Sequence, residues 1–244
     1  MAEGISGLSM GSTLDVNIYG LRARINCLCQ EDKRDISRLL KFFLDDEIAP
    51  TERVFDFRKK ETPQEVGGLI FPQLARKGIW VMHSGGFHFH GGFLTLGPSN
   101  CGKSTFSHMA MKHGYPLLSD DVTLMRENAD NIELLPFYSA IYLKDKMIIP
   151  KQEFFKPVAL KCLLMLRFNN GPVRVKKIEK KIEKLRKITP QFLWSYRTSE
   201  QKRQKRFVEK MCDYPAYEVY WNSDMFGDIA PFKGILDEII QSAR

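Results

Sequence analysis

Apolar residues recur along most of the chain in short blocks, some with strand-like and some with helix-like spacing. Continuous apolar blocks between turn residues predict buried strands, and apolar residues three and four apart predict helices with one buried face. The expected strands cover 79–82, 93–96, 115–118, 160–168 and 216–220. The expected helices cover 104–113, 174–187, 198–210 and 232–242. This alternation predicts an α/β core that begins near residue 76.

The chain before residue 76 has a different pattern. Residues 14–28 alternate between apolar and polar side chains and are rich in β-formers, which predicts one or two strands. A helix is expected over 32–44 and a short strand at 54–57. We therefore expect a small α+β region over residues 1–75 that packs on an α/β domain over residues 76–244.

The composition is that of a folded protein without a membrane span. Hydrophobic residues make up 43% of the 244 residues, and no apolar run approaches the roughly 20 residues that a transmembrane helix needs. Residues 1–12 lack the basic and apolar regions of a secretory signal. The five cysteines form no C-x-x-C pair, which argues against a disulfide framework or structural zinc and for a reducing compartment. We expect a cytoplasmic location.

The positive charge is concentrated in one segment. Residues 174–206 contain 13 basic and three acidic residues, a net charge of +10 that exceeds the +8 of the whole chain. This segment is either the solvated face of surface helices or a patch for an acidic partner, such as an acidic peptide or a phosphorylated ligand. A nucleic-acid partner is the less favoured interpretation, because no recognised nucleic-acid motif accompanies these charges.

The strongest chemical signal is the segment GPSNCGKST at 97–105, which fits the phosphate-binding pattern G-x-x-x-x-G-K-[ST]. Its glycines let backbone N–H groups converge on phosphate oxygens, and the following helix directs the positive end of its dipole at the anion. Lys103 would pair with the β- and γ-phosphates, and the Ser104 hydroxyl would bind Mg²⁺. The expected nucleotide-binding residues are Gly97, Ser99, Asn100, Cys101, Gly102, Lys103, Ser104 and Thr105.

A second signal is the pair Asp120-Asp121 at the end of the expected strand 115–118. The short separation from Lys103 leaves room for one helix, so we expect this strand to lie next to the strand that precedes the loop. One carboxylate could hold Mg²⁺ while the other accepts a proton from an attacking hydroxyl. The alternative is an ordinary Ser-Asp-Asp turn.

Histidine is concentrated around the same region, with His83 directly after an expected strand and before a glycine pair. His83 could therefore reach a site at the loop. A metal site that combines His83 with His88 and His90 is less favoured, because no acidic residue or cysteine lies nearby in sequence.

Three stretches together resemble the C-terminal domain of the HPr serine kinase/phosphorylase family, and in particular its shorter bacterial relatives. They are WVMHS at 80–84, GFLTLGPSNCGKST at 92–105 and GYPLLSDDV at 114–122. The shared order is a histidine after a strand, a phosphate loop, a short helix and a strand that ends in a double aspartate. The family's arginine- and glycine-rich segment after the double aspartate has no counterpart at 138–144.

The resemblance implies a P-loop nucleotide-binding core of the HPr kinase / phosphoenolpyruvate carboxykinase type. It implies transfer of a phosphoryl group from ATP, or alternatively GTP, with Mg²⁺, to a serine hydroxyl. Carried over to this chain, Asp120 is the expected general base, with Lys103 and His83 as the other catalytic residues. Ser104 and Asp121 are the expected metal ligands. Some short relatives phosphorylate a biosynthetic precursor peptide, and the full-length kinases form oligomers.

The sequence is compatible with three functions. The first is a kinase whose acceptor is a peptide or protein hydroxyl, and the second is a kinase of a small-molecule hydroxyl. The third is a nucleotide-gated binding module that recruits a partner without phosphoryl transfer.

Overall fold

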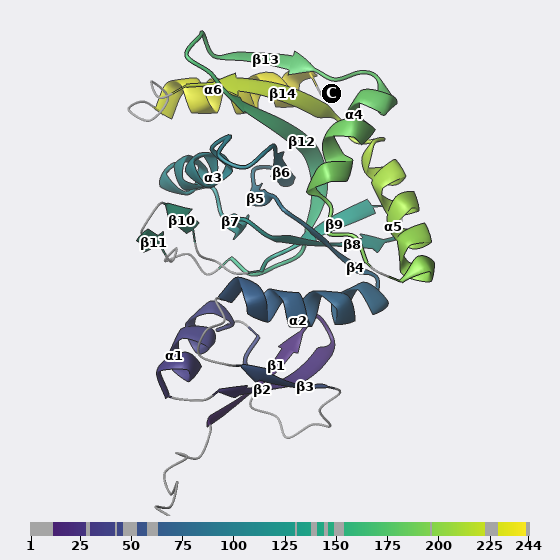
Figure 1. Ribbon diagram of the computed structural model, residues 1–244. Helices are drawn as coiled ribbons and strands as arrows, with labels where there is room; N and C mark the ends of the chain where they lie inside the picture. The colour runs from purple at the N-terminus through teal and green to yellow at the C-terminus, as the bar shows by residue number, and fades with distance from the viewer. Residues whose placement is uncertain are drawn as a thin grey trace, which may run out of the picture. The chain divides into compact units, whose positions relative to one another are not determined.

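A computed structural model gives the fold of the protein (Figure 1). The described residues are 12–27, 30–41, 43–45, 53–57, 63–129, 131–137, 141–143, 146–148, 154–195, 197–222 and 229–242. The N-terminal residues 1–11, Cys29, residues 138–140 and Lys144 lie outside them, and so do the expectations placed on those positions. The chain divides into two compact units, Met1–Lys77 and Gly78–Arg244.

Unit 1 contains a three-stranded sheet in the order β1-β2-β3. Its elements are β1 (Ser12–Ile18), β2 (Leu21–Cys27), α1 (Gln30–Leu39), β3 (Arg53–Phe57) and α2 (Pro63–Arg76). The pair β1 and β2 forms an antiparallel hairpin, whose two turn residues Tyr19 and Gly20 both have positive φ, as the tightest hairpin turns require. The sequence pattern did not predict α2, because Gly67, Gly68 and Pro72 interrupt its apolar spacing.

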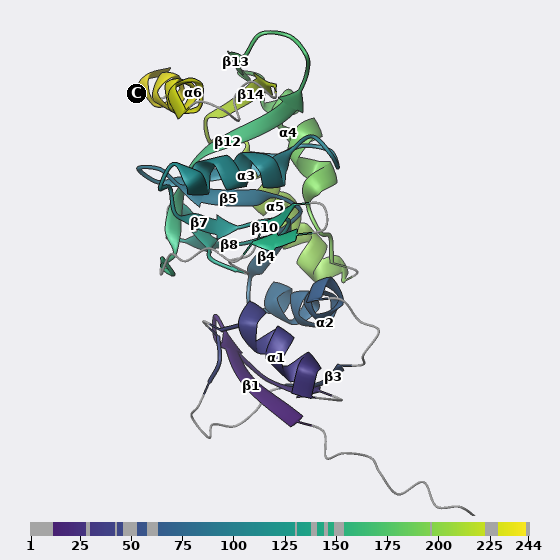
Figure 2. The ribbon, with the colours of Figure 1, turned by 90° about the vertical axis from the view of Figure 1, so that its left-hand side faces the viewer.

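Unit 2 is mixed α/β and is built around a curled nine-stranded sheet (Figures 1 and 2). One path of hydrogen-bonded strands runs β4-β8-β9-β12-β6-β5-β7, and β14 pairs with both β12 and β13. The strands are β4 (Ile79–Met82), β5 (Gly85–His88), β6 (Gly92–Leu96), β7 (Leu117–Ser119), β8 (Thr123–Asn128), β9 (Asn131–Leu135), β12 (Val158–Phe168), β13 (Arg174–Lys177) and β14 (Ala216–Trp221). A separate hairpin consists of β10 (Ile141–Leu143) and β11 (Lys146–Ile148).

The order of strands near the loop differs from the expectation. The stretch after His83, for which no strand was expected, forms β5, which pairs antiparallel with β6 on one side and with β7 on the other. The strand that ends in the double aspartate is therefore one place removed from β6, and the prediction of direct pairing was wrong. Because β5 is antiparallel to both of its neighbours, β7 runs parallel to β6. Asp120 and Gly97, which follow these two strands, therefore leave the sheet at the same edge.

Helices cover the apolar faces of this sheet. They are α3 (Lys103–Lys112), α4 (Lys181–Ile188), α5 (Thr198–Met211) and α6 (Ile229–Ser242). Figure 2 shows α3 lying along β5, with α6 near β13 and β14. Phe106 of α3 and Phe232 of α6 meet with ring centroids 4.8 Å apart, within a core that also includes Phe87, Phe93 and Trp221. This packing fixes α3, and with it the loop that precedes it.

The basic segment is only partly helical. The expected helix over 174–187 was wrong at its start: residues Arg174–Lys177 form β13, which pairs antiparallel with β14, and the helix begins at Lys181. The edge of β14 decided the outcome, because Val175 pairs opposite Val219 there. The N–H of Ile178, just after β13, donates to the carbonyl oxygen of Ala216 at 2.8 Å. Ile182, in the first turn of α4, is 55% exposed.

Within the residues that the structure describes, none of the helices is both long and apolar enough to cross a membrane. Cys101, Cys162 and Cys212 are buried free thiols, and Cys27 is buried as well.

Candidate functional site

The loop from Gly97 to Gly102 connects β6 to α3 and has an unusual backbone. Gly97, Asn100 and Gly102 have φ of 151°, 63° and 90°, a conformation that favours glycine and, to a lesser degree, asparagine. A Cβ on Gly97 would lie 2.6 Å from the sulfur of Cys101, and a Cβ on Gly102 would overlap the ring of Trp221. Both glycines are therefore required by the shape of the loop itself.

Trp221 anchors the loop from a distant part of the chain. This last residue of β14 is 1% exposed, and its indole N–H donates to the carbonyl oxygen of Cys101 at 3.2 Å. The ring also packs edge-on against Phe106, with centroids 6.2 Å apart. The sequence analysis missed Trp221, because no local signal connects it to a loop 120 residues away.

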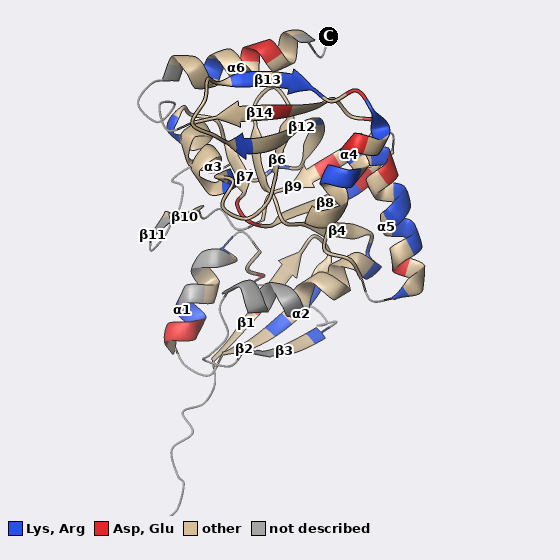
Figure 3. Ribbon diagram, turned by 45° about the horizontal axis from the view of Figure 1, so that its top comes forward, with Lys and Arg blue, Asp and Glu red and all other residues tan. Residues whose placement is uncertain are grey.

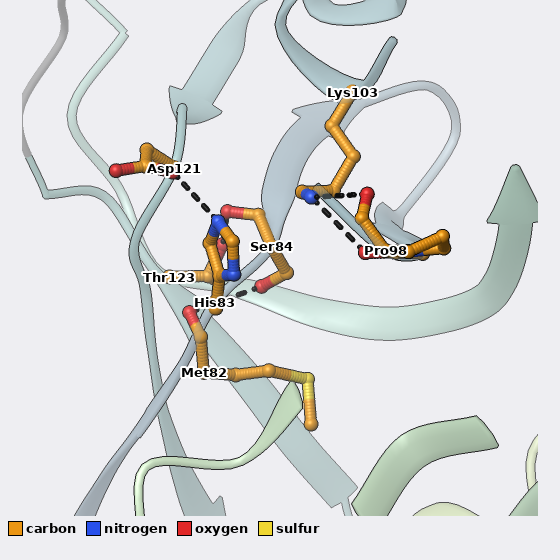
Figure 4. A network of polar contacts seen from close by, with 8 residues as sticks. Met82, His83, Ser84, Pro98, Lys103, Asp121 and Thr123 are labelled. Carbon is orange, nitrogen blue, oxygen red and sulfur yellow. Dashed lines mark hydrogen bonds and ion pairs between the residues drawn. The ribbon is translucent and has the colours of Figure 1, made fainter. Parts of the chain in front are cut away.

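Lys103 is the first residue of α3 and folds back over the loop (Figure 4). Its ammonium donates to the carbonyl oxygens of Gly97 at 3.0 Å and of Pro98 at 3.2 Å. Gly102 is the N-cap residue of this helix and supplies no side-chain cap, and the first turn has no acidic residue. The amide groups at this helix end therefore face outward with a positive potential, an arrangement that suits an anion.

The remaining loop residues divide by exposure. Ser99 and Asn100 are exposed, and Ser104 and Thr105 are half-buried at the start of α3. Cys101 is buried, and desolvation raises the pKa of its thiol, so this residue contributes its backbone and a neutral side chain.

His83 and Asp121 form a hydrogen-bonded pair beside the loop (Figure 4). Nε2 of His83 lies 2.8 Å from Oδ1 of Asp121, and since a carboxylate only accepts, the imidazole is the donor. The hydrogen bond from His83 lowers the pKa of Asp121, and the nearby charge of Lys103 lowers it further. Asp121 is therefore an ionised, half-exposed carboxylate at neutral pH.

A strained turn presents Asp121. Its φ is 66°, and the N–H of Val122 donates to the carbonyl oxygen of Asp120 at 2.8 Å, which closes a three-residue turn. The N–H of Ser84 donates to the carbonyl oxygen of Asp121 at 3.1 Å. Backbone strain of this kind concentrates at functional sites, and here it turns Asp121 toward His83.

Asp120 has a different environment from its neighbour. Its side chain is only 2% exposed, whereas Asp121 is 37% exposed. Around Asp120 lie Thr95 of β6 and Ser107 of α3, whose hydroxyl oxygens lack a hydrogen-bond partner among the described residues. The two aspartates are adjacent in the sequence, but in the structure the carboxyl group of Asp120 is buried and that of Asp121 is accessible.

Gly85 allows β5 to approach this buried group closely. A Cβ there would lie 2.6 Å from Oγ1 of Thr95 and 2.7 Å from Oγ of Ser107. We predict that Gly85→Ala lowers the free energy of unfolding by about 2 kcal/mol, because both hydroxyl groups would have to move within a packed core. Urea unfolding measures this effect.

Gly234 in α6 provides the matched control. A Cβ there meets nothing within 4 Å, so Gly234→Ala should raise the free energy of unfolding by about 1 kcal/mol or less. Equal behaviour of the two variants would contradict the close approach at Gly85.

The other histidines are placed apart from this pair. His88 ends β5, at the opposite end of that strand from His83, and its ring stacks on Phe154 with centroids 5.0 Å apart. Burial lowers the pKa of His88, and the charge of His90 lowers it further. Among the described residues, no three His, Cys, Asp or Glu side chains form a group that could hold a metal.

The structure therefore brings Lys103, the loop, His83 and the double aspartate to one edge of the sheet. Oxygen ligands suit Mg²⁺, and the accessible carboxylate of Asp121 and the half-buried hydroxyl of Ser104 are the oxygen groups that fit it here. The uncapped helix end and the Lys103 ammonium fit the phosphates of a nucleotide.

Likeness between this chain and known proteins is found at the level of structure. No protein-family model matches this chain, and the search of the curated proteins gives no match. Among solved structures, the chain is similar to the HPr(Ser) kinase/phosphatase from Coxiella burnetii. The two are 11% identical, the match covers 66% of this chain and 94% of that chain, and the TM-score is 0.38.

Proposed function

We propose that this protein is an ATP- and Mg²⁺-dependent kinase that transfers the γ-phosphoryl group to a hydroxyl of a peptide or protein, most simply that of a serine. The observation that carries the proposal is the shared sheet edge, where the loop with Lys103 faces a double aspartate and a histidine. Anion-binding groups placed beside an ionised carboxylate, that of Asp121, are what a phosphoryl transfer with a metal ion requires.

Each residue has a role in the proposed reaction. The loop amides and Lys103 bind the β- and γ-phosphates, and Lys103 exchanges the carbonyl oxygens of Gly97 and Pro98 for phosphate oxygens. Ser104 and Asp121 hold Mg²⁺, which when bound neutralises charge on the phosphates. His83 orients Asp121 through their hydrogen bond and faces the transferring group.

Asp120 is the proposed general base. The acceptor oxygen forms a bond to the γ-phosphorus, and its proton passes to the Asp120 carboxylate. The bond between the γ-phosphorus and the bridging oxygen breaks, and ADP leaves with that electron pair. Most of the rate enhancement comes from positioning and charge stabilisation.

An acidic acceptor would suit the basic surface of β13, α4 and α5 (Figure 3). Several of its lysines are already paired, among them Lys177 with Glu179 and Lys181 with Asp213. Other basic residues are exposed and have no acidic partner among the described residues: Lys176, Lys180, Lys202, Lys205 and Arg206. Positive charge of this kind raises the rate of encounter with an acidic segment.

The burial of Asp120 supports one alternative function. A carboxyl group that is 2% exposed could serve the structure alone, in which case the protein would be a nucleotide-gated binding module. Its basic surface would then recruit an acidic partner without phosphoryl transfer.

Label transfer separates the two functions. The purified protein is incubated with γ-labelled ATP and Mg²⁺ in an extract of its source cells, and peptides, proteins and small molecules are separated. A kinase gives a labelled species whose size class identifies the acceptor as a protein, a peptide or a small molecule. ATP binding by the purified protein without any labelled acceptor would favour the binding module.

A further inference from the structure

A segment from the basic part of the chain lies against the edge of β4. After α4, the chain forms the short 3-10 turn Thr189–Gln191 and then pairs with β4 through a bridge between Met82 and Phe192. The N–H of His83 donates to the carbonyl oxygen of Gln191 at 2.7 Å. Phe192 is 3% exposed, so this segment is firmly held and brings Gln191 next to His83.

The side chain of Gln191 connects two parts of the site. With its amide nitrogen turned toward them, Gln191 donates to the carbonyl oxygen of Gly97 at 2.9 Å and to that of His83 at 3.3 Å. The opposite orientation would place the amide oxygen against two carbonyl oxygens, so the hydrogen-bond network assigns the nitrogen to this side.

Gln191 and Lys103 share one acceptor. The carbonyl oxygen of Gly97 accepts from the amide of Gln191 and from the ammonium of Lys103, the latter at 3.0 Å, and a carbonyl oxygen has two lone pairs for this purpose. When Lys103 turns to a bound phosphate, the amide of Gln191 still donates a hydrogen bond to the carbonyl oxygen of Gly97. The start of the loop can then keep its position relative to His83.

We infer that Gln191 is a positioning residue of the phosphoryl-transfer site, which fixes the loop at Gly97 relative to His83 and thereby to the His83–Asp121 pair. This inference rests on the proposed function, because phosphoryl transfer is the reaction that Gln191 would affect. The hydrogen bonds themselves join residues from three separated segments: the start of the loop, the end of β4 and the turn after α4. A residue in this place sets the distance between the bound phosphates and the groups that act on them.

The test uses Gln191→Met, which removes the donor and keeps the length of the side chain, and Gln191→Glu, which places a carboxylate against two carbonyl oxygens. MgATP affinity is measured by titration, and turnover is measured as ATP hydrolysis, with water as the surrogate acceptor. We expect turnover to fall by roughly 10–100-fold, while the dissociation constant for MgATP changes by less than about threefold, because the loop amides and Lys103 remain. Wild-type turnover in both variants would overturn the inference, as would an equal loss of affinity and turnover.

Gln201→Ala is the matched control. Gln201 is a half-buried glutamine that donates to the carbonyl oxygen of Ser195 at 2.8 Å. It lies in the same part of the chain but, within the described residues, makes no hydrogen bond to the loop 97–102. This variant should hydrolyse ATP like the wild type.

A second measurement keeps the inference testable if the wild type shows no turnover, which would count against the proposed function alone. Amide hydrogen exchange is then compared in the ligand-free proteins. Gln191→Met should exchange faster than the wild type at His83 and in the loop 97–102, and should be unchanged in α6. Unchanged exchange at His83 and in the loop would show that Gln191 does not hold them together.

Discussion

Replacing Lys103 with alanine is expected to lower the affinity for MgATP by roughly 10–100-fold. Lys103 is the cation that lies at the start of α3 and reaches the loop carbonyls, and a hydrogen bond to a charged group contributes about 1.5–3 kcal/mol. Isothermal titration with MgATP measures the change. Thermal unfolding should show a folded variant, because the backbone of the loop is held by Trp221 and not by Lys103 alone.

Lys112→Ala is the control for the loss of one positive charge. Lys112 lies in the last turn of the same helix and is exposed, so its removal should leave the affinity within about twofold of the wild type. An unchanged affinity in Lys103→Ala would mean that the loop does not bind the phosphates through this residue.

Asp120→Asn is expected to lower phosphoryl transfer by roughly 10²–10⁴-fold, the usual contribution of a general base, while MgATP still binds. Asparagine has nearly the same shape as aspartate, so the packing around Gly85, Thr95 and Ser107 should survive. The transfer rate is followed with γ-labelled ATP and the acceptor identified by label transfer. Wild-type transfer by this variant would exclude Asp120 as the base.

The neighbouring aspartate makes the comparison specific. Asp121→Asn removes the ionised carboxylate that pairs with His83, so we expect this variant to need a higher Mg²⁺ concentration for half-maximal activity. If Asp120→Asn shifts the Mg²⁺ requirement and Asp121→Asn does not, the two roles are reversed. If neither substitution affects transfer, the double aspartate is a structural turn.

The local parts of the fold could be predicted from the sequence. The strand 79–82 is present with those bounds, and the loop with glycines at 97 and 102 is followed by a helix at Lys103. Glycine at positions with positive φ and an apolar block between turn residues depend on near neighbours in the chain, so a sequence pattern is enough to indicate them. The segment 198–210 was also predicted as a helix and is part of α5.

Elements whose structure depends on a partner were predicted less well. β5 contains two glycines and reads as a flexible stretch, yet pairing with β6 and β7 makes it a strand. Arg174–Lys177 has helix-compatible spacing, but the free edge of β14 recruits it as β13. Strand propensity depends on what the strand packs against, and a single sequence does not contain that information.

The candidate site shows the same division. The sequence by itself determined which residue types are available: a glycine-rich loop, a lysine and serine after it, two adjacent aspartates and a histidine after a strand. Only the tertiary structure decided that Asp120 is buried and that Asp121 is half-exposed and hydrogen-bonded to His83. Only the tertiary structure brought Trp221 and Gln191 to the loop. The reason is physical: local backbone preferences act over a few residues, whereas burial and side-chain hydrogen bonds depend on which distant segments the packed sheet brings together.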